Sequence, residues 1–348
     1  MENSSFPCLC LGGRNKKTPP APATESAIHG VAAFSFKELS AATRKFRKDY
    51  LIGKEEGLYK AYLKSVNQVV AIKIQVVVDN SRSTEQGNSR EEFLSHVRML
   101  SRLRHRNVVD FIGYCADDHH RILVHEFMPL CSLQDHLHDS DPSRDKAARL
   151  DWNSRMKIAV GVSKGLGYLH EHGVVYRGMQ CSNILLGDGY HPKLSEPGMA
   201  ELGRPQVDIE NTQCLKRVAF GYLAPETTIT GWLSMESDVY SFGVVLLVMI
   251  TGRRAFDSSP AVKGEPRLAA WAQPLLEDSS KFPGMVDPAL EGRYALAGLN
   301  RAMDLVSTCI REHPAMRPSI GTVIEALTHI ADSPAEPLGT STSLIGEK

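Results

Sequence analysis

The amino-acid sequence predicts an α+β protein in which a small strand-rich part precedes a larger helical part. The first observation is a β-branched run at residues 69–74, which is typical of a strand. The second is the helical period of the apolar residues at 91–103, and the third is the helical patterning that dominates from Asp151 onward. Within that region, residues 239–250 are apolar almost all round and predict a buried helix.

The composition narrows the class of protein. With 348 residues, 42% hydrophobic residues and a formal net charge of +0, the chain is expected to be a soluble globular protein that binds no nucleic acid. Seven cysteines fit a reducing compartment better than a disulfide framework, so a cytoplasmic location is expected. The longest apolar stretch, 242–250, is far shorter than the roughly 20 residues that span a bilayer, so no transmembrane helix is expected.

One segment carries a recognisable chemical pattern. Residues 176–183 read Tyr-Arg-Gly-Met-Gln-Cys-Ser-Asn, and residues 196–198 read Glu-Pro-Gly. The two stretches resemble the protein-kinase patterns H/Y-R-D-x-K-x-x-N and D-F-G. In this comparison Gly178 takes the position of the catalytic aspartate, Gln180 that of the catalytic-loop lysine and Glu196 that of the metal-binding aspartate.

Further motifs follow in the order and approximate spacing of a protein kinase. They are Val-Ala-Ile-Lys at 70–73, Gly-Tyr-Leu-Ala-Pro-Glu at 221–226, Ser-Asp-Val-Tyr-Ser-Phe-Gly at 237–243 and Met-Arg-Pro at 316–318. The chain from 34 to 331 resembles a plant receptor-like cytoplasmic kinase of subfamily VII. The segments that carry this resemblance are 34–39, which reads Phe-Ser-Phe-Lys-Glu-Leu, 112–116, 129–133, 186–195 and 251–253.

The resemblance implies a bilobal protein-kinase fold. A small β-rich N-lobe at about 34–126 would carry one main helix, and a larger helical C-lobe would occupy about 129–331, after a hinge near 126–128. Residues 15–27 are rich in Pro, Ala, Thr and Lys, and the stretch from Asp332 is poor in bulky apolar side chains, so residues 1–33 and 332–348 are expected to be disordered tails.

The resemblance also implies roles for individual residues. Lys73, Glu126, Met128 and Asn183 are the candidates for nucleotide binding. Asn183 and Glu196 are the candidates for binding Mg²⁺. ATP and Mg²⁺ are therefore the cofactors to consider, although the adaptor function described below requires neither.

Four further residues are expected to be structural. Glu226 and Arg317 would form an ion pair in the large lobe, and Asp238 would hold the backbone of the catalytic loop. Arg177 would either pair with a phosphate on the following loop or bond local backbone carbonyls, and the sequence favours neither interpretation.

The motifs that would face the nucleotide depart from the family pattern. Residues 53–59 read Gly-Lys-Glu-Glu-Gly-Leu-Tyr, which is about two residues short of the glycine-rich loop and brings two glutamates toward a polyphosphate. His96 stands where the glutamate partner of Lys73 belongs, and the alternative partner, Glu92, lies one helical turn earlier. Poor cover of ATP and a missing Lys–Glu pair are therefore expected.

The catalytic and regulatory positions depart as well. The absence of a carboxylate at Gly178 predicts a loss of about 10² to 10⁴ in rate. Gln180 removes a positive charge that would help neutralise the transferring phosphoryl group. Thr212 is the single Ser or Thr between 198 and 225, and Ala219 replaces a threonine, so phosphorylation of this segment is not expected to act as a switch.

The N-terminal tail carries a candidate lipidation site. Cys8 and Cys10 lie among apolar and small residues, close to Arg14, Lys16 and Lys17. This arrangement predicts reversible palmitoylation together with attraction to anionic lipid, and the alternative is an unmodified tail.

Three functions follow from these observations. The leading hypothesis is a pseudokinase, a catalytically impaired adaptor at the cytoplasmic face of the plasma membrane. Its expected partners are receptor-like kinases, other cytoplasmic kinases or immune receptors, and the membrane surface. The second is a weak Ser/Thr kinase that uses Lys73, Asn183 and Glu196 on Mg-ATP. The third is a binding module that nucleotide gates without turnover.

Overall fold

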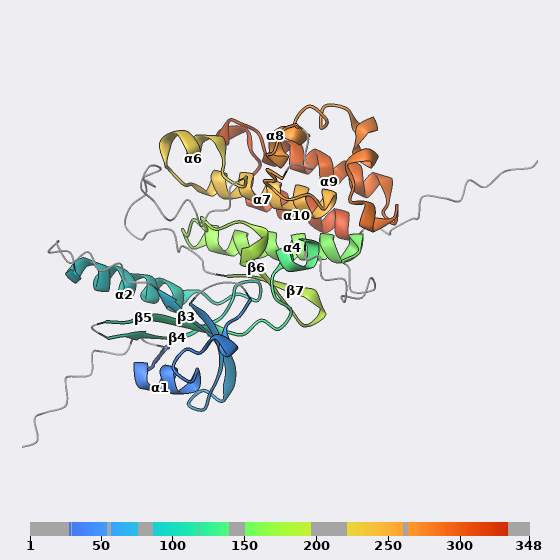
Figure 1. Ribbon diagram of the computed structural model, residues 1–348. Coiled ribbons are helices and arrows are strands. Elements are labelled where there is room, and N and C mark those ends of the chain that lie inside the picture. The colour runs from blue at the N-terminus through green and yellow to red at the C-terminus, as the bar shows by residue number, and fades with distance from the viewer. Residues whose placement is uncertain are drawn as a thin grey trace, which may run out of the picture.

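The computed structural model describes residues 28, 30–53, 57–75, 86–117, 119–138, 150–195, 221–259 and 264–332, with 86–89 described by their backbone alone. It has two lobes, a small one built on a five-stranded sheet and a larger helical one (Figure 1). The bilobal α+β architecture predicted from the sequence is confirmed.

The N-lobe sheet has the strand order β1-β4-β5-β3-β2, in which β1 runs parallel to β4 and the other pairs are antiparallel. The folded part begins earlier than the predicted boundary at residue 34, because Val31 is buried and β1 precedes Phe34. The two alanines of β1 carry no strand signal of their own. The strands are β1 (Ala32–Ala33), β2 (Leu58–Leu63), β3 (Gln68–Gln75), β4 (Phe111–Ala116) and β5 (Arg121–Glu126).

Helices cover both faces of this sheet (Figure 1). Helix α2 (Gln86–Arg102) turns Phe93, Val97 and Leu100 toward the face that carries Leu123. Helix α1 (Phe36–Ala42) covers the other face with Leu39. Because successive side chains of a strand point to opposite faces, β5 contributes Leu123 to the cluster under α2, and Ile122 and Val124 to the cluster under α1. A short 3₁₀ helix, η1 (Lys48–Tyr50), follows α1.

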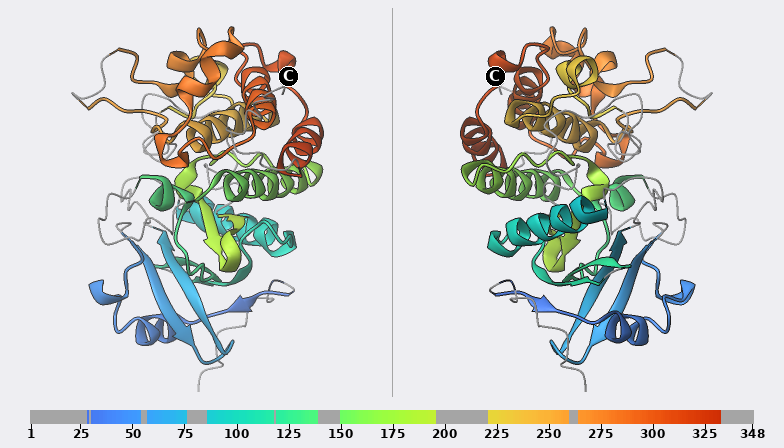
Figure 2. Two further views of the ribbon diagram at one scale, coloured as in Figure 1. Left: turned by 90° about the vertical axis from the view of Figure 1, so that its right-hand side faces the viewer. Right: turned by 90° about the vertical axis from the view of Figure 1, so that its left-hand side faces the viewer.

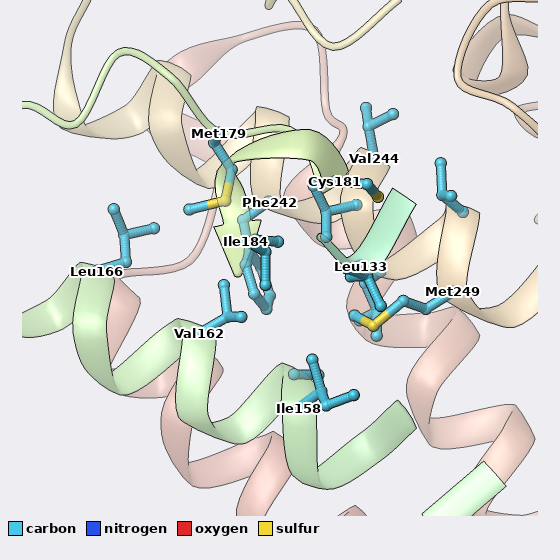
Figure 3. Close-up of a cluster of buried hydrophobic side chains, with 14 of the residues drawn as sticks. Leu133, Ile158, Val162, Leu166, Met179, Cys181, Ile184, Phe242, Val244 and Met249 are labelled. Carbon is cyan, nitrogen blue, oxygen red and sulfur yellow. The ribbon is translucent and has the colours of Figure 1, made fainter. Parts of the chain in front are cut away.

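The C-lobe is built around the central helix α7 (Met235–Thr251). Ser234 and Ser237 form a capping box at its start, and Gly252 ends it in the left-handed conformation, as in many helix C-termini. Figure 3 shows Phe242 and Met249 of α7 in one buried cluster with Ile158, Val162 and Leu166 of α4. The predicted buried helix at 239–250 is confirmed.

The remaining elements surround this core. The helices are α3 (Leu133–His138), α4 (Trp152–Glu171), α6 (Pro225–Thr230), α8 (Leu268–Ala272), α9 (Leu296–Cys309) and α10 (Ile320–Ala331). The short 3₁₀ helices are η3 (Cys181–Asn183), η4 (Asp188–Tyr190), η5 (Ser279–Met285), η6 (Pro288–Leu290) and η7 (Pro314–Met316). None of the described helices is long and apolar enough to cross a membrane.

A two-stranded sheet, β6 (Ile184–Gly187) and β7 (His191–Leu194), lies between α4 and the N-lobe (Figure 2). It is joined to the chain segment 107–109, which lies between α2 and β4 in sequence. Leu194 donates its N–H to the Asn107 carbonyl and accepts the Val109 N–H, each at 2.9 Å. The Asn107 amide donates to the Pro192 carbonyl at 2.9 Å. This segment is therefore fastened to the C-lobe by three hydrogen bonds.

Candidate active-site cleft

A cleft between the two lobes encloses about 670 Å³ of space, part of it open to solvent. The candidates Lys73, Glu126, Met128 and Asn183 all line it, so the structure brings the predicted nucleotide-binding residues together. The other lining residues come from β2, β3, β5 and β6, from the hinge and the residues after it, from the catalytic loop, and from positions just before β2, just before β4 and just after β7. They are Ile52, Leu58, Ala71, Val109, His125, Phe127, Cys131, Ser182, Leu185 and Ser195.

The hinge is held by the side chain of Glu126. Its carboxylate accepts the Asp110 N–H at 2.7 Å and the Lys193 ammonium at 2.5 Å. Lys193 is on β7, so this ion pair joins the hinge to the C-lobe. The Glu126 carboxylate is thus engaged in structural contacts.

The catalytic loop has no acid or base at the position of the family aspartate. Gly178 has no side chain, and its carbonyl accepts a hydrogen bond from the Asn183 amide at 2.9 Å. A Cβ atom at Gly178 would lie 3.1 Å from Asn183 Nδ2, a tight contact with a side-chain atom. The site therefore lacks the proton acceptor, and a Cβ at Gly178 would require the Asn183 amide to shift by a few tenths of an ångström.

Asp238 holds the backbone of this loop, as its predicted role requires. Its carboxylate accepts the N–H of Tyr176 at 2.7 Å and that of Arg177 at 2.8 Å, and it lies 3.0 Å from His170 Nε2. Arg177 has a φ of +64°, which is unusual for a residue with a side chain. The two charge-assisted bonds from Asp238 flank this strained residue and stabilise its backbone.

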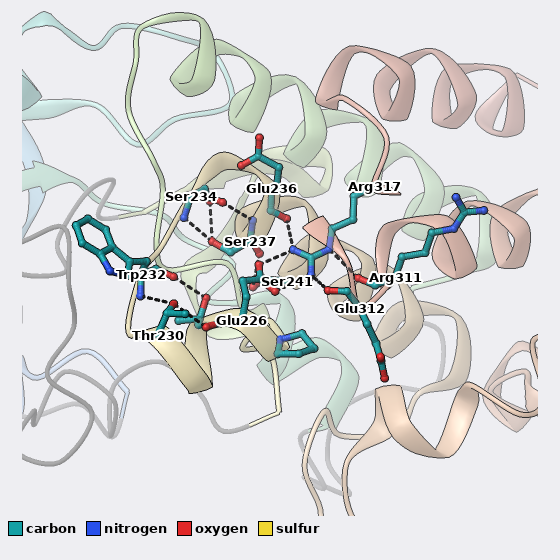
Figure 4. A network of polar contacts seen from close by, with 12 residues as sticks. Glu226, Thr230, Trp232, Ser234, Glu236, Ser237, Ser241, Arg311, Glu312 and Arg317 are labelled. Carbon is teal, nitrogen blue, oxygen red and sulfur yellow. Dashed lines mark hydrogen bonds and ion pairs between the residues drawn. The ribbon is translucent and has the colours of Figure 1, made fainter. Parts of the chain in front are cut away.

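The predicted ion pair of the large lobe is present. Arg317 donates to both carboxylate oxygens of Glu226, at 2.6 and 2.7 Å (Figure 4). The same guanidinium donates to the carbonyls of Glu236, Arg311 and Glu312 at 2.9 to 3.0 Å. The pair thus ties α6 to the start of α7 and to the loop before α10.

At the inner end of the cleft, Lys73 on β3 and His96 on α2 are both buried. His96 occupies the helix position predicted for a glutamate, and Glu92, one turn earlier on α2, is exposed. A carboxylate at position 96 would attract Lys73, and the imidazole does not supply that negative charge.

His125 is the lining residue that sequence reasoning missed. It is buried at the end of β5 and packs beside Phe111, with ring centroids 5.3 Å apart. Burial, and to a smaller extent the electrostatic effects of Lys73 and His96, lower the pKa of His125 to about 3. The sequence signal that could have found His125 was its position directly before the hinge residue Glu126. The strand pattern at this position predicts a buried side chain, but it does not predict that the side chain is polar.

The cleft fits a nucleotide better than it fits a metal ion. Its volume and the buried Lys73 suit a nucleotide with its phosphates. Mg²⁺ prefers carboxylate and water oxygens, and among the described lining residues Asn183 is the one predicted ligand. No group of three His, Cys, Asp or Glu side chains in the described parts of the chain is placed to hold a metal.

Three of the four described cysteines are buried, as is common for cysteines that pack as small apolar side chains. Burial raises the pKa of Cys115 to about 11 and that of Cys181 and Cys309 to about 12, which makes these thiols unreactive. Cys131 is exposed. Several predicted residues lie outside the described residues: Cys8, Cys10, Glu55, Glu56, Glu196, Thr212, Cys214 and Ala219.

Two lobes, a cleft at the hinge, a lysine on β3 and an asparagine after the catalytic loop define the architecture of a protein kinase. A family model described as protein tyrosine and serine/threonine kinase matches residues 53–273. The chain belongs to this family.

Relatives from Arabidopsis thaliana resemble the chain over most of its length. Serine/threonine-protein kinase PBL27 is 48% identical over 94% of this chain and 62% of the relative. Probable serine/threonine-protein kinase PBL7 is 48% identical over 93% of this chain and 84% of the relative. Serine/threonine-protein kinase PBS1 is 49% identical over 87% of this chain and 65% of the relative. The chain thus spans less than two thirds of the length of two of these relatives.

Proposed function

We propose that this chain is a kinase-fold signalling protein that has lost efficient phosphoryl transfer and acts as an adaptor or scaffold. The observation that carries the proposal is the catalytic loop around Gly178. Asp238 and Asn183 hold that loop in place, yet no side chain is present at Gly178 to accept the proton of a substrate hydroxyl. The buried His96 adds to this, because the Lys–Glu pair of an active kinase requires a glutamate there.

The contrast between scaffold and chemistry supports an adaptor. The Glu226–Arg317 pair and the Asp238 contacts are complete, whereas the catalytic side chain is absent. A protein that works through its folded surface needs the first set of contacts and not the second. By resemblance to receptor-like cytoplasmic kinases, the partners we propose are receptor-like kinases, other cytoplasmic kinases or immune receptors.

A weak Ser/Thr kinase is the second candidate, because Lys73 and Asn183 still line the cleft and the relatives are named kinases. In that case ATP would bind along Lys73, and Mg²⁺ would need Glu196 together with Asn183. The third candidate, a module gated by nucleotide without turnover, uses the same cleft and differs in the absence of transfer.

Phosphate transfer from radiolabelled ATP to a general protein substrate tests the proposal. The wild-type chain is expected to show no transfer, and the double variant His96→Glu with Gly178→Asp is expected to gain it, by about 10² to 10⁴ if the general base is restored. The variant Lys73→Ala in the same double background is the matched control and should abolish the gain. Transfer by the wild-type chain that Lys73→Ala abolishes would overturn the proposal in favour of the weak kinase.

Attachment to the cytoplasmic face of the plasma membrane through Cys8 and Cys10 is a separate proposal. It is supported by the composition of the tail alone. Acyl-exchange labelling of the chain from plant cells measures it directly, and equal labelling of the wild type and a Cys8→Ser, Cys10→Ser variant would contradict it.

A further inference from the structure

One end of the N-lobe carries an excess of exposed positive charge. Residues 36–50 hold five basic and two acidic side chains, whereas the whole chain holds 40 Lys and Arg and 40 Asp and Glu. All five basic side chains are exposed. We call this set the basic face, and it consists of Lys37, Arg44, Lys45, Arg47 and Lys48. A local excess of charge in a chain of zero net charge points to a partner of the opposite charge.

The acidic neighbours neutralise little of the basic face. Asp49 pairs with Arg47 at 2.7 Å, but both side chains are more than half exposed, so water screens the pair. Glu38 accepts the Ser65 hydroxyl at 2.6 Å, on the turn between β2 and β3. The same turn adds another exposed cation, Lys64. The basic face therefore keeps most of its positive charge.

The backbone after α1 fixes the position of these side chains. Arg44, Lys45 and Phe46 have φ values of +50°, +62° and +54°, which makes three successive left-handed residues. Such a run is unfavourable for residues with a side chain. Thr43, which is fully buried, holds it in place. Its hydroxyl accepts the Phe46 N–H at 3.1 Å, and its carbonyl accepts the Arg47 N–H at 3.2 Å.

Phe46 turns inward from this run, and its neighbours turn outward. The Phe46 ring packs against the rings of Phe36 and Tyr59, with centroids 5.6 and 5.3 Å away. Lys45 and Arg47, on either side of it, are exposed. Figure 1 shows α1 on the side of the sheet that faces away from the C-lobe. A large flat partner is thus able to approach the basic face without meeting the C-lobe.

The neighbouring part of the chain favours a membrane as this partner. Strand β1 leads into α1 through Phe34 and Ser35, so the N-terminal segment enters the fold just before the basic face. That segment carries Cys8 and Cys10, the candidates for acylation. Stable anchoring of a lipidated protein takes two signals, and a basic patch beside an acyl chain is one way to supply the second.

We propose that the basic face docks on an anionic membrane surface, so that the α1 side of the N-lobe lies against the bilayer and the C-lobe points away from it. The proposal rests on the proposed membrane attachment only in the choice of the partner. It requires neither an acyl group nor the loss of phosphoryl transfer. Its test can therefore fail while those two proposals stand.

Flotation of the purified full chain with lipid vesicles tests the proposal. The chain carries Cys8→Ser and Cys10→Ser, so that no acyl group contributes to binding. It is expected to float with phosphatidylcholine vesicles that contain about 30% phosphatidylserine and not with phosphatidylcholine alone. Raising the salt from about 0.1 M to about 0.5 M should release it, because the contacts are exposed charges.

Two triple variants separate the basic face from the rest of the chain. Arg44→Gln, Lys45→Gln and Lys48→Gln should together weaken binding roughly hundredfold, at about fivefold for each basic residue near the surface. The matched control removes the same charge from exposed positions of the C-lobe, and it should keep the binding; its changes are Lys157→Gln, Lys164→Gln and Arg301→Gln. The melting temperature of each variant reports its folding. If the first variant unfolds, Lys37→Gln with Lys48→Gln replaces it, because this pair leaves the left-handed run unchanged.

Two results would overturn the proposal. One is a folded basic-face variant that binds the anionic vesicles as tightly as the control, since the tail would then carry the binding. The other is a chain that heparin, a soluble polyanion, retains but the anionic vesicles do not bind, since the partner of the basic face would then be no membrane.

Discussion

Replacing Arg317 by methionine should strongly destabilise the C-lobe. The Arg317 side chain is fully buried, donates to both oxygens of Glu226 and three backbone carbonyls, and lies 5.0 Å from the Tyr240 ring centroid (Figure 4). Methionine fills a similar volume but leaves the carboxylate and the carbonyls without their donor. Removing one partner of a buried pair costs about 3–5 kcal/mol.

The measurement is thermal unfolding followed by circular dichroism. At about 2 °C of melting temperature per kcal/mol for a domain of this size, the expected decrease is roughly 6–10 °C. Arg311→Met is the matched control, because Arg311 is exposed and its side chain makes one hydrogen bond, to the Met316 carbonyl at 3.2 Å. That variant should change stability by less than about 0.5 kcal/mol. A melting temperature for Arg317→Met within about 2 °C of the wild type would refute the reasoning.

Two further predictions concern stability. The lowered pKa of His125 means that the unfolded chain takes up a proton at this site more readily than the folded chain. The neutral His125 ring therefore contributes its full share to the free energy of unfolding above about pH 6.5, and this share decreases as the pH falls toward 3. Between pH 7.5 and 5.5 urea unfolding should show about 1 kcal/mol more loss of stability for the wild type than for His125→Phe, and equal losses would contradict the buried neutral state. Gly243→Ala should cost about 1–3 kcal/mol in the same assay, because its Cβ would lie 2.6 Å from Cys309 Cβ and 2.9 Å from Ile310 Cγ2. Gly284→Ala, where nothing lies within 4 Å of the new Cβ, is the control and should be nearly neutral.

Periodicity predicted the elements whose burial pattern is regular. The apolar run at 239–250 lies within α7, and the helical period at 91–103 matches the buried side of α2. Helix α2 begins at Gln86, earlier than the predicted period at 91–103. The prediction missed this start because the first residues of the helix are polar and show no apolar stripe. Strand β1 was missed because two alanines depend on their pairing with β4 and not on any preference of their own.

The candidate site was predictable where a motif fixed the residues, and not where three-dimensional packing did. The resemblance placed Lys73 and Asn183 in one cleft and paired Glu226 with Arg317. It gave no role to His125, since a buried strand position is usually apolar and the neighbours that affect its ring come from β3 and α2. The contact of Glu126 with Lys193 joins residues far apart in the chain and has no signature in either segment.

The hydrogen bonds between residues 107–109 and β7 mean that the structural boundary between the lobes differs from their boundary in the sequence. By sequence this segment belongs to the N-lobe, yet its hydrogen bonds go to Pro192 and Leu194, and a Cβ at Gly165 of α4 would lie only 2.6 Å from the Asn107 carbonyl. A chain cut at the hinge would leave the N-terminal fragment with unsatisfied backbone groups and the C-terminal fragment with an open groove. The segment 107–109 therefore joins the lobes a second time, beside the hinge, and we expect the two lobes to fold together.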